Sequence, residues 1–475
     1  MKFLKRLLYT LLSLVLVVWL ASVVILQLEK NQSAYLKINN HPELKANSYI
    51  ISNVNIIPMT ADTVLENMTV LVENGVIKEI SKAKPFVEVP IIDGKGGYLS
   101  PGLIDMHVHL WDRFELGLYL ANGVTTIRSL LGMPFHLEVK EQLQKSEIIG
   151  PEFYTSSPQF SGPDDGDIFH KQVNTPEEAA QLVIKYKEAG YDYIKTYNLL
   201  PKHLFEAVLN QATLSGIPVI AHPSFLVEYK YHFDDRISTV EHTEDIYQQA
   251  LNYKYDREKL QEVVDGYAHS GQTHCPTITV FFNLTEIYNK GEAYLQSEQI
   301  AYLNSFVEDV GGDYNRHMAI RSSDSSSIQR INEQQQFHME ILQKLYEAGV
   351  NIVAGTDAGI VNTAAGFSIH QELEFYVQAG MSNYEALQTA TRNPSKVYEE
   401  YSNFGTIDLG KHANLILTED NPLKDLSTLK NPKWVMIKGR KIENDLMQQF
   451  KDKAANRKNY LATMIKAISY VLWGK

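Results

Sequence analysis

The sequence predicts an α/β fold, a (β/α)8 barrel of the TIM type that carries a small discontinuous β domain. Eight short apolar segments lie between residues 103 and 359, and amphipathic helical stretches separate most of them, as in a closed parallel barrel. Short strands and turns precede this region at 49–98 and follow it at 404–445. The length of 475 residues suits one large barrel and a second small domain. The two separated β segments can close one small sandwich only by pairing with each other.

The first thirty residues are predicted to be a membrane anchor. Lys2, Lys5 and Arg6 precede an uncharged run from Leu7 to Leu28, which is longer than the roughly 20 residues that a helix needs to cross a bilayer. The run also exceeds the core of a cleavable signal, which is usually about 7–15 residues. The positive charges predict a cytoplasmic N-terminus and a main body of the chain on the extracytoplasmic side, periplasmic or extracellular. The alternative is a cleaved signal segment that releases a soluble exported protein.

The rest of the chain divides by composition. Residues 31–48 are polar and are predicted to be a linker, and residues 49–98 and 404–445 are predicted to form a composite β-sandwich. The barrel is expected over residues 99–403, and residues 446–475 are predicted to form an apolar helical tail with lysines. This tail either lies on the membrane or packs on the barrel.

The barrel strands are predicted where apolar segments end in turn residues. The eight candidates are 103–110, 123–130, 152–157, 191–197, 217–223, 238–244, 272–281 and 350–359. A representative helix follows Thr175, which is a good N-cap, has Pro176 at its first position and stops at Gly190. The long polar segment 283–345 between the last two strands is expected to be a lid, a substrate-facing insertion or a plain solvated surface.

Charge and cysteine content exclude two classes of protein. The chain has 44 Lys and Arg against 56 Asp and Glu, a net charge of −12, with no basic block in its globular part. This composition argues against nucleic acid as a partner. The single cysteine, Cys275, excludes an intrachain disulfide framework.

A set of histidines, one lysine and one aspartate predicts a metal site. His107 and His109 are two residues apart on an apolar strand, so both side chains point to the same face. Buried neighbouring histidines need hydrogen-bond partners or a cation. Four more polar residues lie near the C-terminal ends of other apolar strands: Lys195, His222, His242 and Asp357. Those ends converge at one mouth of a barrel, and histidine and carboxylate groups are ligands of hydrolytic metals such as zinc.

The motifs around these residues resemble a known superfamily. The matching text is "LSPGLIDMHVHL", "NGVTTIRSLLG", "AGYDYIKTYN", "IAHPS", "VEHTED", "GTDAG" and "IHQELEFYVQAGMSNYEALQTATRNPSKVY". From about Tyr49 to Ile442 the chain resembles the amidohydrolase superfamily, and within it the imidazolonepropionase-like and prolidase-like dipeptidase branch. It departs from that branch in the text after His222 and in Arg128-Ser129, where the branch commonly has Arg-Asp.

The resemblance implies a site with two divalent metal ions, expected to be zinc. His107 and His109 would bind one ion together with Asp357, and His222 and His242 would bind the other. Lys195, N-carboxylated by CO2, would bridge both. The chemistry agrees, because two cations roughly 3.5–4 Å apart need an anion between them. A lysine beside them is favoured in its neutral form, although an ordinary strand-end lysine is the alternative.

The expected activity is hydrolysis of the amide bond of a dipeptide or N-acyl amino acid through a metal-bridging hydroxide. Asp357 would take the proton from that hydroxide and return it to the leaving nitrogen. The alternatives are a cyclic amidase of the imidazolonepropionase type and a non-catalytic metal-binding scaffold; a deaminase fits Lys195 less well. Substrate contacts are predicted at Arg128, Tyr197, Tyr231 and His370. A homo-oligomer stays open.

Overall fold

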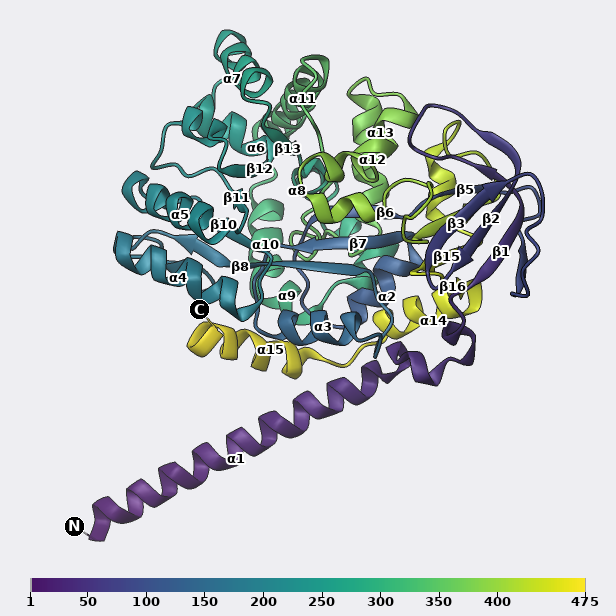
Figure 1. The fold of residues 1–475 in the computed structure, drawn as a ribbon. Helices are drawn as coiled ribbons and strands as arrows, with labels where there is room; N and C mark the ends of the chain where they lie inside the picture. Colours follow the sequence, from purple (N-terminus) through teal and green to yellow (C-terminus); the bar gives the residue numbers. More distant parts are fainter. Residues whose placement is uncertain (1, 475) are drawn as a thin grey trace.

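The computed structural model describes residues 2–474 and shows a barrel, a β domain beside it and one long projecting helix (Figure 1). The predicted fold class is confirmed. The barrel supplies the strand ends that carry the site, so its closure is described first.

Seven parallel strands form the barrel sheet in the order β13-β12-β11-β10-β8-β7-β6. Their bounds are β6 (Leu103–Val108), β7 (Val124–Ser129), β8 (Glu152–Ser161), β10 (Tyr193–Thr196), β11 (Val219–Ala221), β12 (Ile237–Glu241) and β13 (Thr273–Cys275). The short strand β9 (Lys171–Gln172) pairs with the end of β8. The eighth predicted strand is present only as two parallel bridges, His274 with Ile352 and Val108 with Ala358, and these bridges join β13 to β6 and close the ring.

The seventh predicted strand is shorter than expected. Residues 278–281 were included in it, but they are the first turn of α8 (Ile278–Lys290). Pro276 follows the strand, and Thr277 turns the chain with a left-handed φ of 51°. The apolar run therefore spans a strand and a buried helix, which its hydrophobicity alone does not distinguish.

Helices cover the outside of the barrel (Figure 1). They are α2 (Phe114–Ala121), α3 (Phe135–Gln144), α4 (Pro176–Ala189), α5 (Lys202–Ser215), α6 (Thr243–Asp245), α7 (Arg257–Ser270), α11 (Ser325–Glu347), α12 (Ser368–Gln378) and α13 (Asn383–Thr389). The predicted caps of α4 are present, since Thr175 accepts a hydrogen bond from the Glu178 amide at 3.1 Å and Gly190 has a φ of 98°.

The β domain joins the two segments that flank the barrel. Its strands are β1 (Tyr49–Ile56), β2 (Leu65–Glu73), β3 (Val76–Ser81), β4 (Ile91–Asp93), β5 (Tyr98–Pro101), β14 (Leu415–Thr418), β15 (Trp434–Ile437) and β16 (Arg440–Glu443). They form one sheet in which β14 pairs antiparallel with β5, so the discontinuous arrangement is observed directly. A bridge between Val76 and His412 brings β3 back to the segment before β14, and the sheet curls around its own apolar core.

The predicted linker 31–48 is wrong as a free linker. It forms short helical turns at Ser33–Leu36, Ile38–Asn40 and Pro42–Lys45. Leu36 and Leu44 are fully buried in the main apolar cluster. The apolar side chains spaced through this polar stretch dock it on the body, so α1 (Lys2–Gln32) leads into the body without a flexible spacer. Within the described chain, α1 is the one helix long and apolar enough to be a membrane anchor or a signal sequence.

The segment 283–345 and the tail are helical. The first contains the end of α8, then α9 (Ser305–Val307), α10 (Asp313–Arg321) and most of α11, joined by short turns. The tail forms α14 (Asn444–Ala455), which packs on α2, and α15 (Tyr460–Ser469), which continues as one wide turn, Tyr470–Gly474. The α15 helix lies along the side of the body from which α1 leaves (Figure 1).

Candidate metal centre

The residues predicted as metal ligands lie together at the barrel mouth. His107, Lys195, His222, His242 and Asp357 come from different strands or from the residues directly after them. They line one cavity of about 660 Å³ together with His109. Their convergence follows from the fold, because the C-terminal ends of parallel barrel strands meet at one face.

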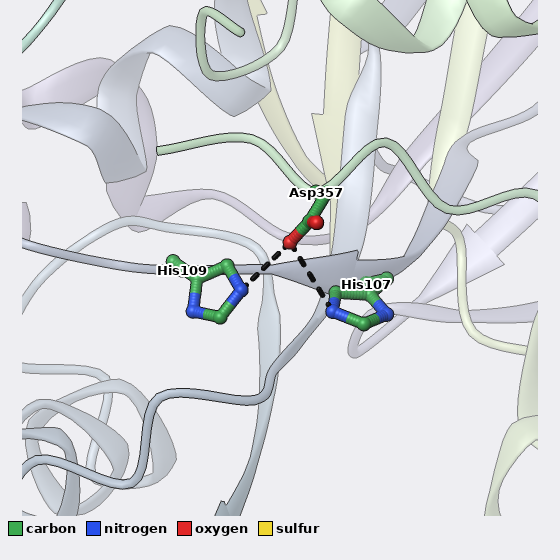
Figure 2. Close-up of side chains that lie close together, drawn as sticks. All are labelled: His107, His109 and Asp357. Carbon is green, nitrogen blue, oxygen red and sulfur yellow. Dashed lines mark ion pairs between the residues drawn. The ribbon is translucent and has the colours of Figure 1, made fainter. Parts of the chain in front are cut away.

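The first cluster consists of His107, His109 and Asp357. The Asp357 Oδ1 lies 2.7 Å from His109 Nε2 and 3.2 Å from His107 Nε2, so one oxygen lies between two imidazoles (Figure 2). Burial acts to raise the pKa of Asp357, but His107 and His109 outweigh it and hold the pKa well below its ordinary value. This cluster therefore offers an anionic oxygen and two ring nitrogens, a donor set that suits zinc and related divalent ions.

The second cluster consists of His222, His242 and Asp245. His222 Nε2 lies 3.3 Å from Asp245 Oδ2, and the rings of His222 and His242 are 4.7 Å apart between centroids. The His242 ring is also 4.7 Å from the His107 ring, so the two clusters adjoin. In each cluster, the three candidate ligand atoms lie within 4.8 Å of one another. Sequence reasoning missed Asp245, although it follows His242 by three residues and is buried.

Lys195 is fully buried in the same site. Its Nζ has no hydrogen-bond partner among the described residues. Burial lowers the pKa of Lys195 to about 8, and the nearby Arg128 guanidinium acts in the same direction. A buried amine with a depressed pKa and no partner is the state in which lysine can react with CO2 and gain an anionic group. The residues present thus fit a pair of divalent ions and an anion between them.

A buried ion pair outside the cavity supports His107 of the first cluster. His107 Nδ1 lies 2.6 Å from Glu241 Oε2, and Arg128 donates to both oxygens of Glu241 at 3.0 and 3.1 Å. The same guanidinium donates to the Tyr398 hydroxyl at 2.9 Å and to the Met106 carbonyl. Arg128 is therefore fully occupied beneath the site and does not line the cavity, so its predicted contact with substrate is wrong.

Two other predicted substrate contacts are also wrong. Tyr231 lies outside the cavity, where Lys202 donates to its hydroxyl. His370 is buried on α12, and its Nε2 lies 3.0 Å from the Asn122 carbonyl oxygen, away from the mouth. In contrast, Tyr197 does line the cavity, with its ring 4.3 Å from the His222 ring.

His170 is a cavity residue that the sequence did not reveal. It lies in the loop between β8 and β9, with its Nδ1 2.7 Å from Asp165 Oδ2 and its ring 4.1 Å from that of Tyr197. A loop histidine has no periodic pattern that would assign it to the mouth. Only its partner five residues earlier gives a signal.

The segment 283–345 and its neighbours form the apolar side of the cavity. These residues include Val280, Phe281, Leu284, Tyr288, Phe306, Val307, Val310, Met318 and Ala319. Because the segment faces the cavity, it is not a plain solvated surface, and the lid and the substrate-facing insertion stay as predictions.

Comparison with known proteins finds a family model that matches part of the chain. The amidohydrolase family model matches residues 284–442. The chain is 23% identical over 399 residues to a 5-methylthioadenosine/S-adenosylhomocysteine deaminase of Caldanaerobacter subterraneus, covering 78% of this chain and 84% of that protein.

Two solved structures share the fold. Bottromycin amidohydrolase superposes with a TM-score of 0.72 at 20% identity, covering 91% of this chain and 97% of that one. A Xaa-Pro dipeptidase with bound methionine superposes with a TM-score of 0.64 at 20% identity, covering 83% of this chain and 100% of that one. These matches show that the chain shares the fold of these amidohydrolase structures, and the amidohydrolase family model matches its C-terminal part.

Proposed function

We propose that this amidohydrolase-family hydrolase cleaves the amide bond of a dipeptide or an N-acyl amino acid with the help of two divalent metal ions, zinc in the first instance. The observation that carries the proposal is the convergence of two adjoining ligand clusters and a buried, unpartnered Lys195 in one cavity. A non-catalytic scaffold would have no need for a lysine of lowered pKa at this place.

Divalent ions bound here would make water more acidic and would polarise a substrate carbonyl. The chain itself supplies the proton transfer. Asp357 is ionised and faces the cavity, so it can accept a proton at Oδ2 and return it to the leaving nitrogen. Tyr197 stacks beside His222 and can orient the substrate amide.

Lys195 is proposed to carry the N-carboxylate. Carboxylation joins the neutral Nζ to CO2 and releases a proton, which replaces a potential cation by an anion between the two clusters. Its full burial and the absence of a competing partner among the described side chains favour this reaction. A carbamate signal from full-length protein equilibrated with 13C-labelled bicarbonate, absent in Lys195→Ala, would test the assignment.

Deamination is a second candidate, because the Caldanaerobacter relative bears that name. It differs in its product, since deamination of an aminopurine releases ammonia whereas cleavage of a dipeptide releases two amino acids. Assaying both products on the same preparation separates the two reactions.

The test is a library of dipeptides and N-acyl amino acids, presented to zinc-loaded full-length protein in detergent, with Asp357→Asn as the inactive control. We expect release of free amine from at least one substrate class, and none from the control. Elemental analysis of the same preparation adds a second criterion. A metal content well below one ion per chain, with no hydrolysis, would overturn the proposal in favour of a scaffold.

We further propose that α1 is retained as an anchor and that the catalytic domain lies on the extracytoplasmic side. The large apolar side chains of α1 are exposed from Phe3 to Val24, and Glu29 in its last turns is buried against the body. Detection of the Met1 peptide in the mature protein by mass spectrometry would support the anchor, and its loss would favour a cleaved signal.

A further inference from the structure

The two faces of α15 are unusual for a helix on the surface of a soluble protein. Its inward face is buried and carries Lys466, the single charged residue between Tyr460 and Leu472. Its outward face is apolar: Leu461 is 51% exposed, Ile468 is 48% exposed and Leu472 is 59% exposed. A helix at the protein surface normally turns its polar side to water. The outward face of α15 thus lacks an apolar partner within the described chain.

The position of α15 relates this face to α1. Glu29, which directly follows the uncharged run of α1, is buried and accepts from Lys466 at 2.8 Å. Arg113 contacts the other oxygen of Glu29 at 3.4 Å, and Lys30 pairs with Glu138 at 2.6 Å. These contacts fix the end of the apolar run against α15 and the body. If α1 crosses a bilayer, the end of its apolar run at Glu29 lies near the bilayer surface, beside Lys466 of α15. Figure 1 shows α15 on the side of the body from which α1 leaves.

The cavity lies behind the same helix. The ring of Phe169 stacks on Tyr470, with 6.4 Å between centroids, and the ring of Phe306 meets Tyr460 edge-on at 5.5 Å. Phe169 and Phe306 both line the cavity. One layer of side chains therefore separates α15 from the space above the metal ligands.

The character of the cavity agrees with an apolar substrate. Aromatic and aliphatic side chains form most of its lining. Among the described lining residues, Lys195 is the one lysine and no arginine is present. A substrate held mainly by charge would need cationic groups here. A long acyl chain needs the apolar surface that is present.

We propose that the outward face of α15 lies in the surface of the bilayer that α1 crosses, and that the cavity takes up the acyl chain of an amphipathic amide from this bilayer. This inference rests on the proposed amide hydrolysis and narrows its substrate to N-acyl amino acids with long acyl chains. Water adds across the C–N bond, giving a fatty acid and a free amino acid. A membrane enzyme held without a flexible spacer suits a substrate that resides in the membrane.

The first experiment locates α15 relative to lipid. Because Cys275 is buried, Ile468→Cys in the full-length chain can be labelled with a fluorophore at one exposed thiol. The protein is reconstituted in phosphatidylcholine vesicles that contain nitroxide-labelled lipid. The matched control is Leu214→Cys on α5, an exposed leucine (82%) on another side of the body, and unmodified protein gives the labelling background.

We expect nitroxide lipid to quench the label at 468 strongly and the label at 214 weakly. Equal quenching at the two positions would overturn the proposal. Quenching between labels at 468 that depends on protein concentration, without quenching by lipid, would also overturn it, because it would indicate a second copy of the chain on this face.

The second experiment measures hydrolysis of N-acylglycines from acetyl to palmitoyl in the same vesicles. We expect kcat/KM to rise about three- to fourfold per added methylene until the apolar space is filled. Changing Leu461, Ile468 and Leu472 together to serine should lower turnover of long-chain amides and leave acetylglycine turnover unchanged. Hydrolysis without chain-length preference would overturn the inference but keep the proposed function. No hydrolysis of any amide, with metals bound, would contradict both.

Discussion

The two halves of the proposed metal centre are the cluster of His107, His109 and Asp357 and the cluster of His222, His242 and Asp245. Each half has two histidines and one aspartate, but the two aspartates differ in their pKa. In the first half, Asp357 contacts both histidines and its pKa is held well below the ordinary value. In the second half, burial and the neighbouring Glu244 raise the pKa of Asp245 well above its ordinary value. The surroundings therefore favour a negative charge in the first half before any metal arrives and disfavour it in the second half.

The hydrogen-bond partners of the histidines also differ between the two halves, and they too favour the first half. The imidazole of His107 is paired with the carboxylate of Glu241, and Arg128 holds that carboxylate in place. The imidazole of His242 is hydrogen-bonded to the neutral hydroxyl of Thr277, which lies 2.8 Å from its Nδ1. Because an anionic partner fixes the ring and increases its basicity more than a hydroxyl does, the first half should bind its ion more tightly. The site is thus pre-organised on one side, and it should be filled in two steps.

The largest effect is expected at Asp357, which is proposed to serve both the first ion and the proton transfer. Asp357→Asn keeps the shape of the side chain but removes its basicity, so turnover should fall by about 10²- to 10⁴-fold. Steady-state kinetics on a hydrolysed amide, with the metal content of each preparation measured in parallel, would check this. Asp245→Asn is the matched control, expected to cost much less. Near-normal turnover of Asp357→Asn would show that another group is the base.

Stepwise removal of metal tests the difference in affinity directly. Chelator titration should release one ion from the second half well before the other, because the second half has the weaker anionic ligand. His222→Ala should remove the weakly held ion and leave the tightly held one, whereas His109→Ala should reduce the tightly held one. Metal content after gel filtration reports both variants. Simultaneous loss of both ions in the unmodified protein would show that the halves are not independent.

The same two halves show what sequence could and could not predict. The sequence predicts all six proposed ligands because each is a polar residue at the end of an apolar strand, and the six line one cavity because strand ends meet in a closed barrel. The sequence pattern does not show how far a residue on a strand lies from the mouth of the barrel. Arg128 lies below the mouth, so this residue, which the sequence predicts as a substrate contact, is an internal partner of Glu241. The sequence does contain part of the information needed to predict this pair, because two opposite charges within apolar strands must pair when buried.

Contacts made by irregular segments were the least predictable. The barrel and the pairing of β5 with β14 follow from alternating patterns, but His170 reaches the cavity from a loop, and α9 reaches it from a long polar segment. The polar residues 31–48 were read as a linker because their few apolar side chains, among them Leu36 and Leu44, show no regular period. Tertiary packing, not local pattern, places these segments.

An intermediate effect is expected at Glu241. Glu241→Gln removes the charge behind His107 and should weaken metal binding in the first half about 10- to 100-fold. It also leaves the buried Arg128 without its counter-ion, which should cost about 3–5 kcal/mol of stability. Competition with a zinc-binding dye measures the first effect and urea denaturation the second. Glu152→Gln, which removes an ion pair with Lys438 near the β domain, is the control for general loss of a carboxylate. Unchanged metal affinity in Glu241→Gln would remove the proposed reason for the difference between the halves.

The smallest effect is expected at Thr277, and it sets the lower end of the comparison. Thr277→Ala removes the hydroxyl beside His242 Nδ1 and leaves the ring held only by packing. A neutral hydrogen bond contributes about 0.5–1.5 kcal/mol, so affinity for the second ion should fall by about tenfold or less and the first ion should be unaffected. Thr277→Ser keeps the hydroxyl and should restore binding, which separates its role from the left-handed backbone at this residue. Thr277→Ala could instead lower the affinity for the second ion as much as Glu241→Gln lowers that for the first. A hydroxyl would then support a histidine ligand as effectively as an anchored carboxylate does. The stronger binding of the first half would then rest on Asp357 alone.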